Sequence, residues 1–249
     1  MIRTFFAAAV AVAMFAMPAQ AQFTNSGNAG SGNRSTSGVI KDTSNYSHFG
    51  VSYVNRTYSY DVKGAEDYSS NGIGVNYITG ISLSKDMPIF LQTGARVDLG
   101  FGTIDKEDSP YGVDMKVTTL SAAIPANIAY KFTLNEGRTT ITPYAGLNFK
   151  FNILGKGKFD TDDEDDDYEY YAYDDEEDEG SDDDTINFFD KKDMGGKDGV
   201  WKRFQLGWQI GATVAFNSFY VNVEYGTDFS ELAKKLKTST FAIGAGFNF

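Results

Sequence analysis

Apolar and polar residues alternate along most of this chain from about residue 48 to its end. Between residues 204 and 216, every second residue is apolar, and the same holds from 219 to 225 and from 240 to 249. Strict alternation is typical of a β-strand with two different faces. Similar segments lie near 48–60, 72–84, 90–101, 119–130 and 141–152, which brings the number of predicted strands to eight.

Two observations support this assignment. The dipeptide Asn217-Ser218 is predicted to form a two-residue hairpin turn that pairs Phe216 with Phe219 on one face. The predicted connections also alternate in length. The short ones are 84–88, 133–140 and 217–218, and the long ones are 61–71, 103–114, 155–199 and 228–238. Short turns on one side and long loops on the other are typical of barrels in bacterial outer membranes.

The sizes of the residues on the two faces indicate which face points outward. One face carries bulky Phe, Trp, Tyr and Leu, whereas the other carries Gly, Ala, Ser and Thr with a few long polar groups. Because the interior of an eight-stranded barrel is just wide enough to be filled by side chains, the bulky apolar face is expected to face lipid. The sequence thus predicts an all-β fold, an eight-stranded antiparallel transmembrane β-barrel with short periplasmic turns and longer extracellular loops. An aromatic-rich soluble sandwich is the competing interpretation.

Aromatic residues are predicted to form two belts at the membrane interfaces. The expected belt near the short turns is Phe90, Tyr130, Phe132, Phe216, Phe219, Phe247 and Phe249. The expected belt near the long loops is Tyr58, Phe101, Phe149, Phe151, Trp201, Phe204 and Phe229.

The chain begins with features of an exported protein. Residues 1–21 combine a positively charged start, a 12-residue apolar stretch and the small-residue run Ala19-Gln20-Ala21, which together predict a cleaved signal peptide. The polar segment 22–46 reads as a flexible leader, and the barrel is expected over 47–249. The chain has no cysteine, so disulfides and thiolate metal sites are excluded. The expected location is the outer membrane, with the N- and C-termini in the periplasm.

The net charge of −12 comes from one segment. Residues 160–184 hold 17 of the 34 acidic residues and no Lys or Arg, so the rest of the chain has a net charge of +5. Such a segment is expected to be a disordered extracellular loop insert that binds cations weakly. An EF-hand read from Asp160 would place Asp165 and Tyr171 at its sixth and twelfth positions, which does not match the motif.

Six charged residues are expected to face the lumen: Arg56, Arg96, Asp98, Lys150, Arg203 and Glu224. Isolated charges in a narrow interior are costly, so they are expected to pair, with Glu224 meeting Arg96 or Arg56 and blocking the lumen. The alternative is a selective pore lined by the same groups. Outside the barrel, Ser230–Lys237 is expected to form either one or two helical turns or a solvated loop end.

Three segments resemble known outer-membrane barrels. The C-terminal run Phe241-Ala-Ile-Gly-Ala-Gly-Phe-Asn-Phe249 resembles their assembly signal, which implies that Phe241, Phe247 and Phe249 are read by the barrel-assembly machinery. Residues 201–211 and 225–235 resemble Bacteroidetes-type porin-like barrels, with the OmpA/OmpX-like eight-stranded barrels as broader relatives. The resemblance covers about 47–249 and implies architecture more than activity.

The predicted function is that of a non-enzymatic barrel that presents surface loops for structural, adhesive or interaction roles. A small-solute channel is the alternative, and an enzyme acting on lipid or peptide is the third hypothesis. The only histidine, His48, has no catalytic partner assignable from the sequence. No catalytic residue, cofactor or specific metal site is predicted. The expected partners are outer-membrane lipid, lipopolysaccharide and the assembly machinery, without nucleic acid.

Overall fold

The computed structural model describes residues 41–61, 67–105, 114–159, 185–194, 196 and 200–249. The predicted signal peptide, most of the predicted leader and the acidic segment 160–184 lie outside these residues. Eight long strands form the barrel wall: β1 (Tyr46–Tyr60), β2 (Tyr68–Ser82), β3 (Ile89–Ile104), β4 (Met115–Tyr130), β6 (Thr139–Phe159), β8 (Phe204–Phe216), β9 (Phe219–Asp228) and β10 (Leu236–Asn248). Short additions are β5 (Phe132–Leu134), the 3-10 turn η1 (Asn135–Gly137) and β7 (Thr185–Asn187).

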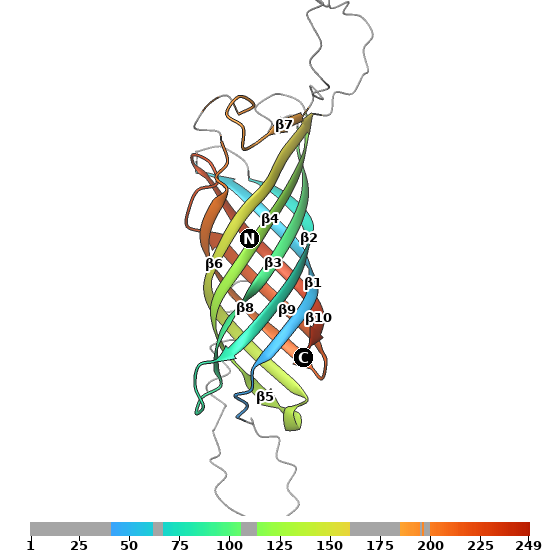
Figure 1. The fold of residues 1–249 in the computed structure, drawn as a ribbon. Coiled ribbons are helices and arrows are strands. Elements are labelled where there is room, and N and C mark those ends of the chain that lie inside the picture. Colours follow the sequence, from blue (N-terminus) through green and yellow to red (C-terminus); the bar gives the residue numbers. More distant parts are fainter. Residues whose placement is uncertain (1–40, 62–66, 106–113, 160–184, 195, 197–199) are drawn as a thin grey trace, which may run out of the picture.

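The wall is a closed antiparallel sheet (Figure 1). Each long strand pairs with its neighbours in the chain, and the ladder between β1 and β10 closes the barrel, with His48 opposite Asn248 and Tyr60 opposite Leu236. Beyond the ladder, the backbone N–H groups of Ser47 and Phe249 each donate to the other residue's carbonyl, at 2.9 and 3.0 Å. The fold predicted from alternation is confirmed. The hairpin at Asn217-Ser218 is confirmed as well, because Phe216 pairs with Phe219 and Asn217 adopts the positive φ of 53° that Asn tolerates.

Bulky apolar side chains cover the outside of the barrel. Val51, Ile73 and Phe219 are 60%, 64% and 62% exposed, whereas their neighbours Ser52 and Tyr220 are buried inside. This alternation follows from the two-residue period of a strand. No helix among the described residues is long and apolar enough to span a membrane.

The interior contains an apolar cluster at each end. At the end with the long connections, called the long-loop end, a cluster forms around Tyr58, Leu232, Leu236 and Trp201, and the full set of its buried members is Tyr58, Ile104, Met115, Val117, Phe188, Trp201, Leu232, Ala233 and Leu236. We call this the aromatic cap. At the opposite, short-turn end, Tyr46, Phe90, Ala129 and Tyr144 form a smaller cluster, called the floor.

Three residues assigned to the outer aromatic belts lie inside instead. Phe90 and Tyr58 are fully buried, and Trp201 is 7% exposed. Phe90 lies two residues before the buried Gln92, and Tyr58 two residues after the buried Arg56, so the strand period turns both inward. Trp201 precedes β8 and folds over the barrel mouth, where its ring stacks on Phe188 at 4.3 Å between centroids.

The segment Ser230–Lys237 forms no helix. Leu232, Ala233 and Leu236 are buried in the aromatic cap, and an isolated bridge joins Ala233 to Leu236. Burial of these apolar side chains fixes a tight turn, in which Lys235 takes a φ of 61°. The predicted helical turns are therefore wrong. The predicted solvated loop end is correct for the exposed Lys234, Lys235 and Lys237 but not for the buried apolar residues next to them.

Candidate functional site

The candidate site is the polar middle of the barrel, between the aromatic cap and the floor. Its core is a chain of ion pairs. Arg56 Nη2 lies 3.8 Å from Asp98 Oδ2, Arg96 Nε lies 3.1 Å from the same oxygen, and Arg96 Nη1 pairs with Glu224 Oε1. The side chains of Arg96 and Glu224 are each only 11% exposed. Four charges from three strands thus meet across the lumen.

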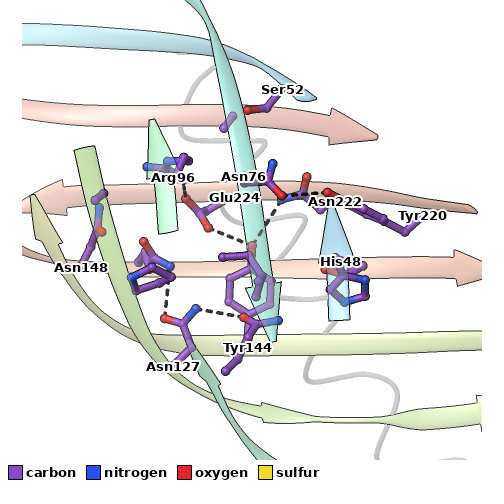
Figure 2. A pocket seen from close by; sticks show the side chains of 17 residues that line it. His48, Ser52, Asn76, Arg96, Asn127, Tyr144, Asn148, Tyr220, Asn222 and Glu224 are labelled. Atoms are coloured by element: carbon purple, nitrogen blue, oxygen red, sulfur yellow. Dashed lines mark hydrogen bonds and ion pairs between the residues drawn. The ribbon is translucent and has the colours of Figure 1, made fainter. Parts of the chain in front are cut away.

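Hydroxyl groups add further hydrogen bonds to these charges. Tyr144 Oη donates to Glu224 Oε2 at 3.0 Å, and Arg56 Nη2 donates to Ser121 Oγ at 2.9 Å. Figure 2 shows Arg96, Glu224 and Tyr144 joined in one run of contacts. Hydrogen bonds between charged groups in a confined interior are stronger than in water, so this network fixes the side chains across the lumen.

A second ion pair lies nearer the long-loop end. Lys150 Nζ pairs with Asp228 Oδ2 and donates to Thr238 Oγ1 at 3.1 Å. Next to it, Asn152 Nδ2 donates to Gln205 Oε1 at 2.9 Å. These three contacts form an upper polar layer directly beneath the aromatic cap.

The six predicted lumen residues divide into two groups. Arg56, Asp98, Arg96, Lys150 and Glu224 all lie inside, in the network and in the upper polar layer. Arg203 does not. It is exposed, its guanidinium lies 4.4 Å from the centroid of the Phe189 ring, and its Nη1 donates to the Ile153 carbonyl at 3.2 Å. Odd-numbered residues of β8, such as Gln205 and Gln209, point inward. Arg203 would point inward as well only if β8 extended to it, but β8 begins at Phe204.

Sequence analysis missed Asp228, Tyr144 and Lys131. Asp228 shares the inward parity of Glu224, so the strand period could have identified it as the partner of Lys150. With Asp228, the described residues of the ion-pair network and the upper polar layer include three cations and three anions, which balance. Tyr144 shares the inward parity of Lys150 on the same strand, so the period could also have placed its hydroxyl in the lumen.

Lys131 anchors the segment that precedes β1. Its Nζ lies 2.9 Å from Asp42 Oδ2, donates to the Ser44 carbonyl at 2.8 Å, and lies 4.9 Å from the centroid of the Phe90 ring. Residues 42–44, predicted as part of a flexible leader, are therefore held against the short-turn end. We call this contact the strap. Burial raises the pKa of Asp42, but hydrogen bonds from Ser44 and Lys131 more than offset it, so this pKa lies below its usual value.

A cavity of about 40 Å³ lies between the ion-pair network and the floor. Side chains from many strands line it, among them His48, Asn76, Asn148, Asn222 and Glu224 (Figure 2). A chain of amides runs along one wall, in which Gln209 Nε2 donates to Asn127 Oδ1 at 3.2 Å and Asn127 Nδ2 donates to Gln92 Oε1 at 3.0 Å. No group of three or more metal-ligating side chains occurs in the described part of the chain.

The residues proposed as an assembly signal lie on the closing strand. Phe247 and Phe249 are 53% and 69% exposed on the outer surface. The ring centroids of Phe247 and Phe219 are 5.1 Å apart. Phe241 shares their face. Phe247 and Phe249 thus lie outward at the C-terminal end of β10, whereas Phe241 lies in the middle of the strand, opposite Asn55.

Comparisons with known proteins complete these observations. No protein-family model matches the chain, and no curated protein matches it. Among solved structures, it is similar to Ail, the attachment invasion locus protein of Yersinia pestis, in complex with the heparin analogue sucrose octasulfate (14% identity, 82% of this chain and 99% of that chain, TM-score 0.38).

Two further solved structures are similar. They are Neisserial surface protein A, NspA (12% identity, 82% of this chain and 97% of that chain, TM-score 0.38), and the N-terminal β-barrel domain of Pseudomonas aeruginosa OprF (14% identity, 80% and 97%, TM-score 0.28). Identities and TM-scores this low establish neither a shared family nor a shared function. The resemblance to Bacteroidetes-type porin-like barrels stays a prediction.

Proposed function

We propose that this protein is an integral outer-membrane barrel without enzymatic activity, whose side-chain-filled lumen makes it a stable platform for surface loops. One observation carries the proposal: bulky apolar side chains are exposed around the barrel while charged and amide side chains are buried within it. Val51 and Ile73 are at least 60% exposed, yet Asp98 and Lys150 are 3% and 2% exposed. Water disfavours such an outer surface, and hydrocarbon solvates it.

The long-loop end is proposed to face the cell exterior, with both termini on the periplasmic side. Exposed basic residues and outward aromatic residues both occur at this end, for example Lys202 and Lys237 together with Phe204 and Phe229. Aromatic rings favour the membrane interface, and cations favour anionic headgroups such as the phosphates of lipopolysaccharide. The acidic segment 160–184 belongs to the longest connection at this end and is proposed to bind cations weakly.

The lumen is proposed to be closed rather than open. The aromatic cap, the upper polar layer, the ion-pair network and the floor all lie across it, and the network carries balanced charge. A small-solute channel is the alternative, because the same charged groups would line a pore if they separated. A catalytic role has less support, since neither ring nitrogen of His48 has a hydrogen-bond partner among the described residues.

Four measurements test this proposal. The refolded protein is expected to partition into lipid vesicles as a heat-modifiable barrel and to give no steady conductance in planar bilayers. Large, steady channels in the unmodified protein would establish the channel alternative. A monodisperse, folded monomer in buffer without detergent would refute the membrane assignment. Protease protection of residues 160–184 on intact cells would reverse the proposed orientation.

A further inference from the structure

We infer that the cavity beneath the ion-pair network is a hydration site for about three ordered waters, and that these waters exchange through the short-turn end. The inference rests on the closed lumen proposed above. It assigns a ligand class and an entry side to the interior of the barrel.

The cavity has the size of a small water cluster. The cavity volume is about 40 Å³. Each water needs roughly 10–15 Å³ of cavity volume, so the cavity holds about three water molecules. The wall side chains are held in place by direct contacts. His48 packs between Tyr46 and Tyr220, with ring centroids 5.0 and 4.7 Å away, and Tyr220 Oη donates to Asn76 Oδ1 at 2.9 Å. The walls therefore cannot easily collapse to fill the space.

Several polar atoms on the cavity wall lack a partner in the described part of the chain. They include both ring nitrogens of His48, Ser52 Oγ and Gln209 Oε1, on side chains that are 5%, 6% and 2% exposed. Asn148 Oδ1 and Asn222 Oδ1, which also line the cavity, likewise lack a partner among the described residues. Figure 2 shows His48, Asn148 and Asn222 approaching the cavity from different strands. Each such buried group left unpaired costs about 1–3 kcal/mol, so a hydrogen-bonding ligand is strongly favoured.

The charge of the cavity selects a neutral ligand. Two ionic groups reach the lining, Arg96 and Glu224, and they neutralise each other directly. The free atoms comprise carbonyl-type acceptors, a hydroxyl and an imidazole, which together offer both donors and acceptors. Water satisfies such a mixed set, whereas a bare cation or anion would bring an unbalanced charge into the interior.

The layers on the two sides of the cavity differ in depth. Toward the long-loop end lie the ion-pair network, the upper polar layer and the aromatic cap. Toward the short-turn end lies the floor, where the strap from Lys131 to Asp42 and Ser44 holds the chain against Phe90. Exchange through the floor therefore breaks fewer contacts, and release of the strap is the step that admits water.

The native chain contains no cysteine, which allows single-cysteine reporters. Thr213→Cys places a thiol in the cavity, and Gln205→Cys places one in the upper polar layer. The probe is methyl methanethiosulfonate, added to the refolded barrel in micelles. Lys131→Met removes the strap's charge-assisted hydrogen bonds while keeping an apolar stem over Phe90, and we expect it to speed labelling of Thr213→Cys about tenfold. Phe188→Ala, which thins the aromatic cap, is the matched control.

Each variant is expected to change the labelling rate at only one of the two reporter positions. Lys131→Met speeds labelling at position 213 alone, and Phe188→Ala speeds labelling at position 205 alone. Two results would refute entry through the short-turn end: faster labelling of position 213 in the Phe188→Ala variant, or unchanged labelling of position 213 in the Lys131→Met variant. Oxygen-17 relaxation counts the long-lived waters: about three are expected, none would overturn the hydration site, and Ala123→Leu is expected to displace them. Conductance of the unmodified protein, measured in parallel, reports separately on the closed lumen.

Discussion

Removal of the Glu224 carboxylate tests the ion-pair network most directly. In the Glu224→Ala variant, Arg96 loses one of its two carboxylate partners and Tyr144 Oη loses the acceptor to which it donates at 3.0 Å. A buried hydrogen bond to a charged group contributes roughly 1.5–3 kcal/mol, and an orphaned buried hydroxyl costs roughly 1–3 kcal/mol. Because Asp98 still lies 3.1 Å from Arg96 Nε, we expect a loss in unfolding free energy of about 3–4 kcal/mol, below the maximum for an isolated buried charge.

Urea unfolding in lipid vesicles, followed by tryptophan fluorescence and by heat-modifiable migration, measures this loss. Lys85→Ala, at an exposed turn position, is the control and should change stability by less than about 0.5 kcal/mol. A double-mutant cycle with Arg96→Met isolates the pair. Coupling of about 0.5 kcal/mol or less would refute the claim that Arg96 and Glu224 hold each other inside the lumen.

Three other predictions concern the surface, the strap and the closing strand. Ile73→Arg, on the outer face, should destabilise the barrel in vesicles by about 2–4 kcal/mol, whereas Tyr60→Arg at the rim should cost about 1 kcal/mol or less; equal effects would contradict a lipid-facing wall. Since the folded pKa of Asp42 lies below its usual value, its pairing with Lys131 stabilises the fold above the unfolded pKa of about 3.9, and this contribution is lost as the pH falls through the folded value. Unfolding midpoints measured from pH 7 to pH 3 should therefore fall less steeply in Asp42→Asn than in the native protein, and parallel curves would count against the strap. Deletion of Phe249 removes its two backbone hydrogen bonds with Ser47 and its exposed ring, so slower insertion is expected in a reconstituted assembly assay, with Lys85→Ala again as control; unchanged insertion would argue against a role in assembly.

The sequence was sufficient to predict the wall of the barrel, because a two-residue period acts on every strand in the same way. Phe216 and Phe219 could be placed opposite each other from the period and the turn alone. The same period predicts that Phe90 and Tyr58 point inward, as the structure shows. The prediction of outer aromatic belts placed both residues on the wrong face because it did not follow the period.

The side-chain contacts at the two ends of the barrel were harder to predict from the sequence. The position of Trp201 depends on how the chain returns over the mouth, where Gly155 leaves room for it. A Cβ on Gly155 would lie 3.0 Å from the Trp201 ring. Arg203 lies outside because β8 begins at Phe204. The strap depends on a contact between Asp42 and Lys131, which are far apart in the sequence and follow no shared period. Such tertiary contacts are set by packing between segments, which alternation does not encode.

The seam between the first and last strands has a consequence for biogenesis. It joins His48 to Asn248, residues separated by roughly 200 positions, so the free edge of β1 stays unpaired until β10 has been made. Until then, two unpaired edges and an apolar outer wall remain open to self-association. Contacts of such long range also form slowly. We therefore expect such a chain to require a chaperone that shields these edges during transport and releases the chain at the membrane.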